Sequence, residues 1–136
     1  MREPRRAHDP GPMLPFWCSF VTTLALLAGA LWTGWRARRR AHLWLAPLAI
    51  VALAVTVVLT ERLLRAAEFP QQAMRIHLAF AKTAAVLVVP VILSGLWLLR
   101  RPRARRLHLV CVGLFLALAV AATGTGIWVF SLSTPR

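Results

Sequence analysis

The sequence contains no tyrosine, only four acidic residues and only two cysteines among its 136 residues. The motifs GxSxG, Walker A and CxxC, which mark common enzyme classes, are absent. No acidic pair falls within an apolar stretch, since the acids are Glu3, Asp9, Glu61 and Glu68. We therefore predict no catalytic residues, and two cysteines do not make a disulfide framework. These absences leave room for a protein whose chemistry, if any, belongs to a bound haem or quinone.

Arginine and apolar side chains are abundant instead. The net charge is +13, 59% of the residues are hydrophobic, and the mean hydropathy is +0.66. The apolar residues form four blocks, each close to the about 20 residues that cross a hydrocarbon core. A soluble protein with this charge would suggest nucleic acid, but these arginines lie between apolar blocks, where orientation and anionic headgroups account for them. We predict an integral membrane protein whose partner is the lipid bilayer, including anionic headgroups, and not nucleic acid.

The four blocks predict an all-α protein, an antiparallel four-helix transmembrane bundle. Pro90 falls inside the third helix and predicts a kink there. We expect a flexible N-terminal tail over 1–13, a four-helix transmembrane domain over 14–131 with helices at about 14–35, 42–64, 74–99 and 107–130, and a C-terminal tail over 132–136.

The distribution of arginine predicts the orientation. The loops after the first and third helices hold nine arginines, against seven in the rest of the chain. These two loops are therefore expected on the cytoplasmic side of a bacterial inner membrane, with both termini outside. A signal peptide is the rival interpretation of the first helix, because Ala28-Gly29-Ala30 resembles a cleavage site, but the arginines that follow oppose export.

An internal repeat appears at an offset of 66 residues. The segment from Gly29 to His42 then matches the segment from Gly95 to His108, with the same spacing around an Arg-rich loop. This match favours two helical hairpins of common origin. Small residues mark where helices approach in lipid, and they predict a bundle interior formed by Ala46, Ala49, Thr56 and Thr60, by Ala81, Ala84 and Gly95, and by Gly113, Ala117, Ala121 and Gly124.

Three histidines are the candidate cofactor ligands. His42 and His108 each begin a helix on the cytoplasmic side, and two facing imidazoles ligate a haem iron or a metal. The alternative is that both are silent interfacial residues. His77 is expected to face inward on the opposite side, where His8, Met13 and Met74 would add copper-binding groups. Its alternative role is that of a hydrogen-bonded structural histidine.

Lys82 is the ionisable residue placed well inside an apolar stretch, and such residues often mark function. Its long stem also permits the ammonium group to reach the outer interface and pair with Glu61. We keep both interpretations, a snorkelling lysine and a contact to a proton, quinone or substrate.

The chain resembles small four-helix bacterial membrane proteins of the YozB/CtaM type, which are linked to maturation of haem-copper terminal oxidases. The resemblance is carried by the Arg-rich loop ending in His42, by His77 followed by Val89-Pro90, and by Arg105-Arg106-Leu107-His108 leading to Ala122-Thr123-Gly124. The family usually has a tyrosine and a histidine near the outer end of the second helix, where this chain has Thr56, Thr60 and Glu61. An outer metal or haem site implied by the resemblance would lack those groups.

The resemblance implies a non-enzymatic accessory or assembly factor for a respiratory oxidase, with oxidase subunits as partners and with haem b or copper as a transient cofactor. A second hypothesis is a small b-type cytochrome that uses His42 with His108 or His77 as axial ligands. A third is a structural subunit whose small-residue stripes pack against a partner.

Overall fold

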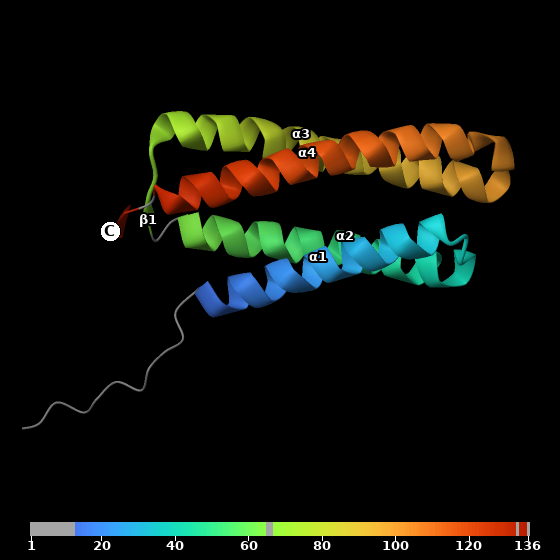
Figure 1. Ribbon diagram of the computed structural model, residues 1–136, viewed down its shortest axis with the longest axis horizontal. Coiled ribbons are helices and arrows are strands. Elements are labelled where there is room, and N and C mark those ends of the chain that lie inside the picture. The colour runs from blue at the N-terminus through green and yellow to red at the C-terminus, as the bar shows by residue number, and fades with distance from the viewer. Residues whose placement is uncertain (1–12, 65–66, 133, 136) are drawn as a thin grey trace, which may run out of the picture. The chain divides into compact units, whose positions relative to one another are not determined.

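The computed structural model describes residues 13–64, 67–132 and 134–135. The long elements are four α-helices: α1 (Met13–Trp35), α2 (Arg39–Leu64), α3 (Gln71–Arg100) and α4 (Arg105–Ser131). A short 3-10 helix η1 (Pro102–Ala104) precedes α4, and two strands of two residues each are β1 (Ala67–Glu68) and β2 (Thr134–Pro135). Figure 1 shows α1 beside α2 and α3 beside α4. The prediction of a helical chain with four long apolar helices is confirmed.

Each helix begins up to three residues before its predicted start and ends within one residue of its predicted end. The predictions followed apolar residues alone. Arg39, Arg105 and Gln71 belong to residue types with high helix propensity, so the helical backbone extends past the apolar boundary. α3 continues through Pro90, and α2 contains a second internal proline, Pro47.

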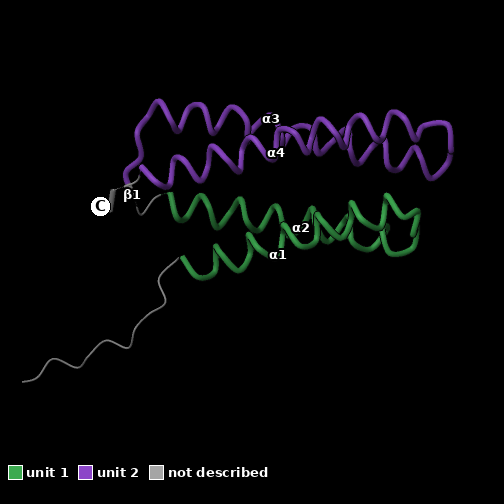
Figure 2. The backbone as a smooth tube through the Cα atoms, in the orientation of Figure 1, with its two compact units in different colours: residues 1–66 green, residues 67–136 purple. Residues whose placement is uncertain are grey.

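The chain divides into two compact units, residues 1–66 and residues 67–136 (Figure 2). Each unit contains one helical hairpin. This division matches the two hairpins that the internal repeat predicts, and their common origin remains a hypothesis. The N-terminal tail with His8, and parts of the predicted loop and C-terminal tail, lie outside the described residues.

In unit 1, buried positions repeat every seven residues along both helices, the spacing of helices that wind around each other. They are Phe16, Thr23 and Ala30 in α1 and Ala49, Thr56 and Leu63 in α2. The connecting turn contains Ala37 with φ of 54°, a left-handed conformation that lets the chain reverse within three residues.

Three hydroxyl groups join α1 to α2 near the end of the hairpin away from the turn. Ser19 Oγ lies 2.7 Å from Thr56 Oγ1, which lies 2.9 Å from Thr23 Oγ1. The Thr23 hydroxyl donates to the carbonyl of Ser19, so Thr56 donates to Thr23 and accepts from Ser19. This closed set satisfies every hydroxyl proton inside an apolar hairpin.

In unit 2, the corresponding end of the hairpin is joined by backbone and rings. β1 pairs antiparallel with β2, Glu68 opposite Thr134, which brings the two ends of the unit together. Phe69 meets Phe130 edge-to-face with centroids 5.6 Å apart. The buried residues of α3 and α4 include Ala84, Ser94 and Val129.

Part of the predicted small-residue interior is buried within the two hairpins, and the predicted role of the α4 stripe in a four-helix bundle stays a prediction. Ala49 and Thr56 of α2 and Ala84 of α3 are buried. On α4, however, Gly113, Ala117 and Gly124 are exposed, and a Cβ on Gly113 or Gly124 would meet no atom within 4 Å. The contact glycine is instead Gly126, two residues and therefore about 200° around the helix from Gly124. The glycine of α4 that faces α3 is therefore Gly126, which packs against the His77 ring and not against another small residue.

Candidate functional site

The three described histidines are half-buried, and each contacts the opposite helix of its own hairpin. They share one arrangement, in which the imidazole lies against a glycine of that helix. We call this arrangement a histidine–glycine dock, and the described residues contain three: His42 on Gly34, His77 on Gly126 and His108 on Gly95.

The His42 dock shows why glycine is favoured at the contact. His42 Nδ1 lies 2.8 Å from the carbonyl oxygen of Ala30, which is four residues before Gly34. A side chain one turn further along a helix normally covers such a carbonyl. A Cβ on Gly34 would lie 3.2 Å from His42 Nδ1. The missing side chain thus opens a backbone acceptor to a ring from the neighbouring helix.

The His77 dock repeats this geometry in unit 2, at the end of the hairpin away from its turn. His77 Nδ1 lies 3.1 Å from the carbonyl oxygen of Ala122, four residues before Gly126, and 3.3 Å from Thr125 Oγ1. A Cβ on Gly126 would lie 3.2 Å from His77 Cε1. The prediction that His77 faces inward, toward the helical interface, is confirmed.

The His108 dock inserts one hydroxyl between the ring and the backbone. His108 Nδ1 lies 3.0 Å from Ser94 Oγ, and that hydroxyl is also within hydrogen-bond distance of the carbonyl of Val91, four residues before Gly95. A Cβ on Gly95 would lie 3.3 Å from His108 Cε1. The Ser94 hydroxyl thus lies between the His108 ring and the Val91 carbonyl, and it contacts both.

The hydrogen bonds assign the tautomer of two rings. A carbonyl oxygen only accepts, so His42 and His77 donate from Nδ1–H. In the neutral ring the lone pair then lies on Nε2. Metal-binding histidines are oriented in the same way, by an Nδ1–H bond to a carbonyl or carboxylate. Ser94 Oγ lies within hydrogen-bond distance of both the Val91 carbonyl oxygen and His108 Nδ1, so its contact fits either tautomer of His108.

The spacing along unit 2 separates two of the candidate ligands. His108 bonds to Ser94, which lies 17 residues along α3 from His77. At a rise of 1.5 Å per residue, this separation is about 25 Å. One iron with nitrogen bonds of about 2 Å does not join them. Pairs that include His42 would join the two units and remain predictions. No group of three or more His, Cys, Asp or Glu residues suited to a metal occurs in the described ranges.

Lys82 and Glu61 are both exposed, Lys82 on α3 and Glu61 near the end of α2. Their predicted ion pair would join the two units and remains a prediction. Cys18 and Cys111 are free thiols, Cys18 exposed and Cys111 half-buried. Met13 and Met74, proposed with His77 as copper ligands, also belong to different units, and that site remains a prediction.

Sequence reasoning found the histidines but missed their partners. Gly34 and Gly126 were not singled out, and Ser94 was not considered. The available signal was the run Thr123-Gly124-Thr125-Gly126, in which the two threonines lie on opposite faces of the helix and so do the two glycines. No protein-family model matches this chain, and neither curated proteins nor solved structures include a significant match.

Proposed function

We propose that this protein is an integral membrane protein of the bacterial inner membrane, in which the two hairpins form an antiparallel four-helix bundle. The observation that supports it is the exposure of its apolar side chains: Trp44 is 76% exposed, Val120 71% and Val86 68%. Water disfavours exposed apolar surface by about 25 cal/mol per Å². Four helices of this length and composition remove that cost by standing in lipid.

Cysteine labelling tests the orientation. In a chain with Cys18 and Cys111 replaced by alanine, Ser131→Cys marks the end of α4 and Arg38→Cys marks the turn between α1 and α2. A membrane-impermeant maleimide should label Ser131→Cys in intact cells and Arg38→Cys only after the membrane is opened. The reverse pattern would place both termini in the cytoplasm.

Within the membrane, we propose a non-enzymatic accessory or assembly factor linked to a respiratory haem-copper oxidase. The observation behind a non-catalytic role is that His42, His77 and His108 each hold two helices together. The oxidase link rests on the sequence resemblance around these residues. Oxidase subunits are the proposed partners, and haem b or copper is the proposed transient cofactor.

Gene deletion in the host tests the oxidase link. Loss of the protein should lower the spectrally assembled haem-copper oxidase and its oxygen uptake while other membrane cytochromes remain. Re-expression of the intact chain should restore the oxidase. If the deletion strain has an unchanged amount of assembled oxidase, the oxidase link is refuted, while the proposed membrane placement is not affected.

A small b-type cytochrome is the second candidate, favoured by the Nδ1–H tautomer that leaves the lone pair of His42 and of His77 on Nε2. A reduced-minus-oxidised visible spectrum of detergent-purified protein, with metal analysis on the same sample, separates the candidates. A sharp b-type band that disappears in His42→Ala would support the cytochrome. A flat spectrum without stoichiometric metal would leave the accessory role.

A structural subunit is the third candidate, favoured by the exposed small-residue face of α4 at Gly113, Ala117 and Gly124. Such a face permits close approach of a helix from a partner. Ala117→Leu should then shrink the complex isolated in mild detergent. An unchanged complex size would count against this subunit role.

A further inference from the structure

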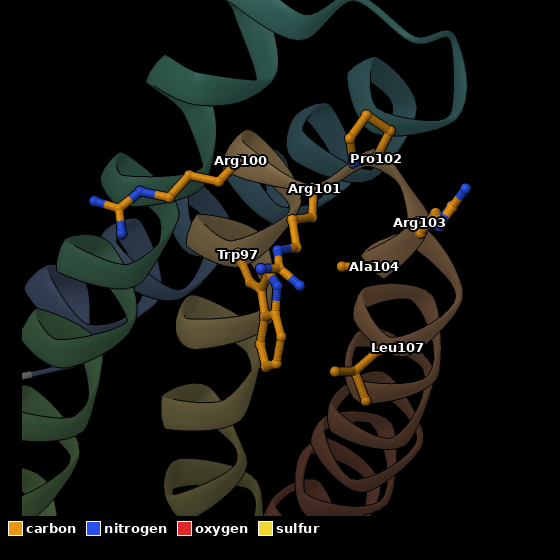
Figure 3. A pocket seen from close by; sticks show the side chains of 7 residues that line it. All are labelled: Trp97, Arg100, Arg101, Pro102, Arg103, Ala104 and Leu107. Carbon is orange, nitrogen blue, oxygen red and sulfur yellow. The ribbon is translucent and has the colours of Figure 1, made fainter.

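The turn between α3 and α4 encloses an open pocket of about 530 Å³ (Figure 3). Its walls combine two kinds of residue, arginines above and apolar side chains below. The lining residues are Trp97, Arg100, Arg101, Pro102, Arg103, Ala104 and Leu107. Figure 3 shows Arg101 extending down toward Trp97, while Arg100 and Arg103 project outward on either side.

Pro102 explains the direction of Arg101. A residue before proline is disfavoured in the helical region, and Arg101 has φ of −136° and ψ of 102°. The Arg101 backbone N–H still bonds to the Trp97 carbonyl at 2.9 Å, so α3 ends there and the chain leaves in an extended conformation. The guanidinium therefore turns back along the helix instead of continuing outward with it.

The charge of this region has no local counterpart in unit 2. Five arginines lie between residues 100 and 106. The acidic residue described in unit 2, Glu68, precedes α3 at its other end, about 45 Å away along a helix of this length. An anion that enters the pocket therefore meets several positive charges at a site which the described residues of unit 2 do not neutralise.

The lower walls of the pocket suit a hydrocarbon chain. Trp97 is 53% exposed and Leu107 is 49% exposed, so both present apolar surface beneath the arginines. Tryptophan and arginine together are typical of the level at which lipid headgroups meet acyl chains. A ligand that fits both walls carries a phosphate and an adjacent apolar tail.

We propose that this pocket binds the phosphodiester of an anionic phospholipid, with Arg101 as the phosphate contact and Trp97 and Leu107 against the first part of the acyl chain. The proposal rests on the proposed membrane placement of the helices. An arginine fork forms two parallel hydrogen bonds to phosphate, which favours a defined site over diffuse attraction.

The turn between α1 and α2 supplies a matched control. It is also rich in arginine, but the Arg36 guanidinium lies 4.6 Å from the centroid of the Trp32 ring and so stacks on its own helix. This cation–π contact engages the flat face of the guanidinium. Arg36→Gln and Arg101→Gln remove the same charge from two Arg-rich turns.

The experiment titrates the full chain in detergent with short-chain phosphatidylglycerol, phosphatidylcholine and inorganic phosphate, and follows binding by native mass spectrometry. The ionic strength is held at about 0.15 M, so that distant charges are screened. Phosphatidylglycerol should bind best. Arg101→Gln should weaken its binding roughly tenfold, the size of one charge-assisted contact, whereas Arg36→Gln should change it less than about twofold. Arg101→Lys, which keeps the charge and loses the fork, should lie between them.

Several outcomes would overturn the proposal. Equal binding of both lipids would remove the headgroup preference, and equal losses in Arg36→Gln and Arg101→Gln would reduce it to bulk charge. Phosphate binding as tightly as phosphatidylglycerol, with no effect of Trp97→Leu, would assign a free-phosphate site instead. Circular dichroism must show the same helix content in each variant, and Arg101→Lys substitutes for any variant that does not fold.

Alkaline extraction separates this proposal from the one on which it rests. A protein that stays in the membrane pellet but shows no lipid preference would refute the pocket alone. A protein released into the soluble fraction would refute both the membrane placement and the lipid site.

Discussion

The two hairpins place a histidine at the same point and dock it differently. His42 and His108 are each the fourth residue of their helix. His42, however, docks on a glycine eight residues upstream, whereas His108 docks on a glycine thirteen residues upstream. The difference is one residue in the connecting turn and four more residues of α3 beyond Gly95, about one helical turn. That extra turn carries Trp97 and Arg100, which line the pocket.

The comparison shows that two hairpins of different length at the turn both carry a histidine–glycine dock near it. At the opposite ends the two units differ in chemistry as well. In unit 1 hydroxyl groups form the hydrogen bonds between α1 and α2 at this end. In unit 2 the imidazole of His77 forms the corresponding contact with Thr125. Cross-helix polar bonds near both ends of each hairpin hold helices that are otherwise joined by few buried side chains.

The largest expected effect is at the His77 dock. Gly126→Val inserts a branched side chain where even a Cβ would lie 3.2 Å from the ring. We expect a loss of about 1–3 kcal/mol, typical of overpacking, measured as reversible unfolding in detergent. Gly124→Val is the matched control, because the same residue type is added to the same helix in open space. Equal losses would mean that the added branched side chain, and not its contact with the His77 ring, determines stability here.

The second largest loss of stability is expected at Thr56 in unit 1. Thr56→Val removes the hydroxyl that bonds to both Ser19 and Thr23 and leaves side-chain volume nearly unchanged. The loss should be about 1–2 kcal/mol, since interhelical hydrogen bonds in membrane proteins contribute up to about 1.7 kcal/mol each. Thr22→Val is the control, because Thr22 is exposed and bonds only within its own helix. A control as destabilising as Thr56→Val would show that the cross-helix bonds add nothing.

The sequence alone predicted most of this fold and only half of the candidate site. Helix existence and bounds followed from apolar blocks, which need no knowledge of partners. The dock glycines did not, because Gly124 and Gly126 look alike in sequence and differ only in which face of α4 meets α3. His77 was oriented correctly because it shares a stripe with Ala84, whereas Arg101 required the backbone conformation that Pro102 imposes.

A smaller effect should appear at the two turns. Pro102→Ala releases Arg101 from its extended conformation, so phosphatidylglycerol binding should weaken roughly threefold as an unrestrained arginine is ordered on binding. Ala37→Gly relieves the left-handed alanine in the other turn and should stabilise the protein by about 1 kcal/mol without changing lipid binding. Unchanged lipid affinity in Pro102→Ala would show that the proline does not preorganise the pocket.

The smallest expected change in stability tests whether residues 66 positions apart, one in each hairpin, have equivalent surroundings. Gly29 and Gly95 correspond at that offset, yet a Cβ on Gly29 would meet only Leu45 Cδ1, at 3.4 Å, whereas a Cβ on Gly95 would lie 3.3 Å from the His108 ring. Gly29→Ala should stabilise by up to about 1 kcal/mol through helix propensity, because a leucine methyl moves easily. Gly95→Ala should lose that gain, because a ring held by Ser94 moves less readily. Two equal gains would show that His108 tolerates the methyl group, so that the shift in register between the hairpins has no energetic consequence at this position.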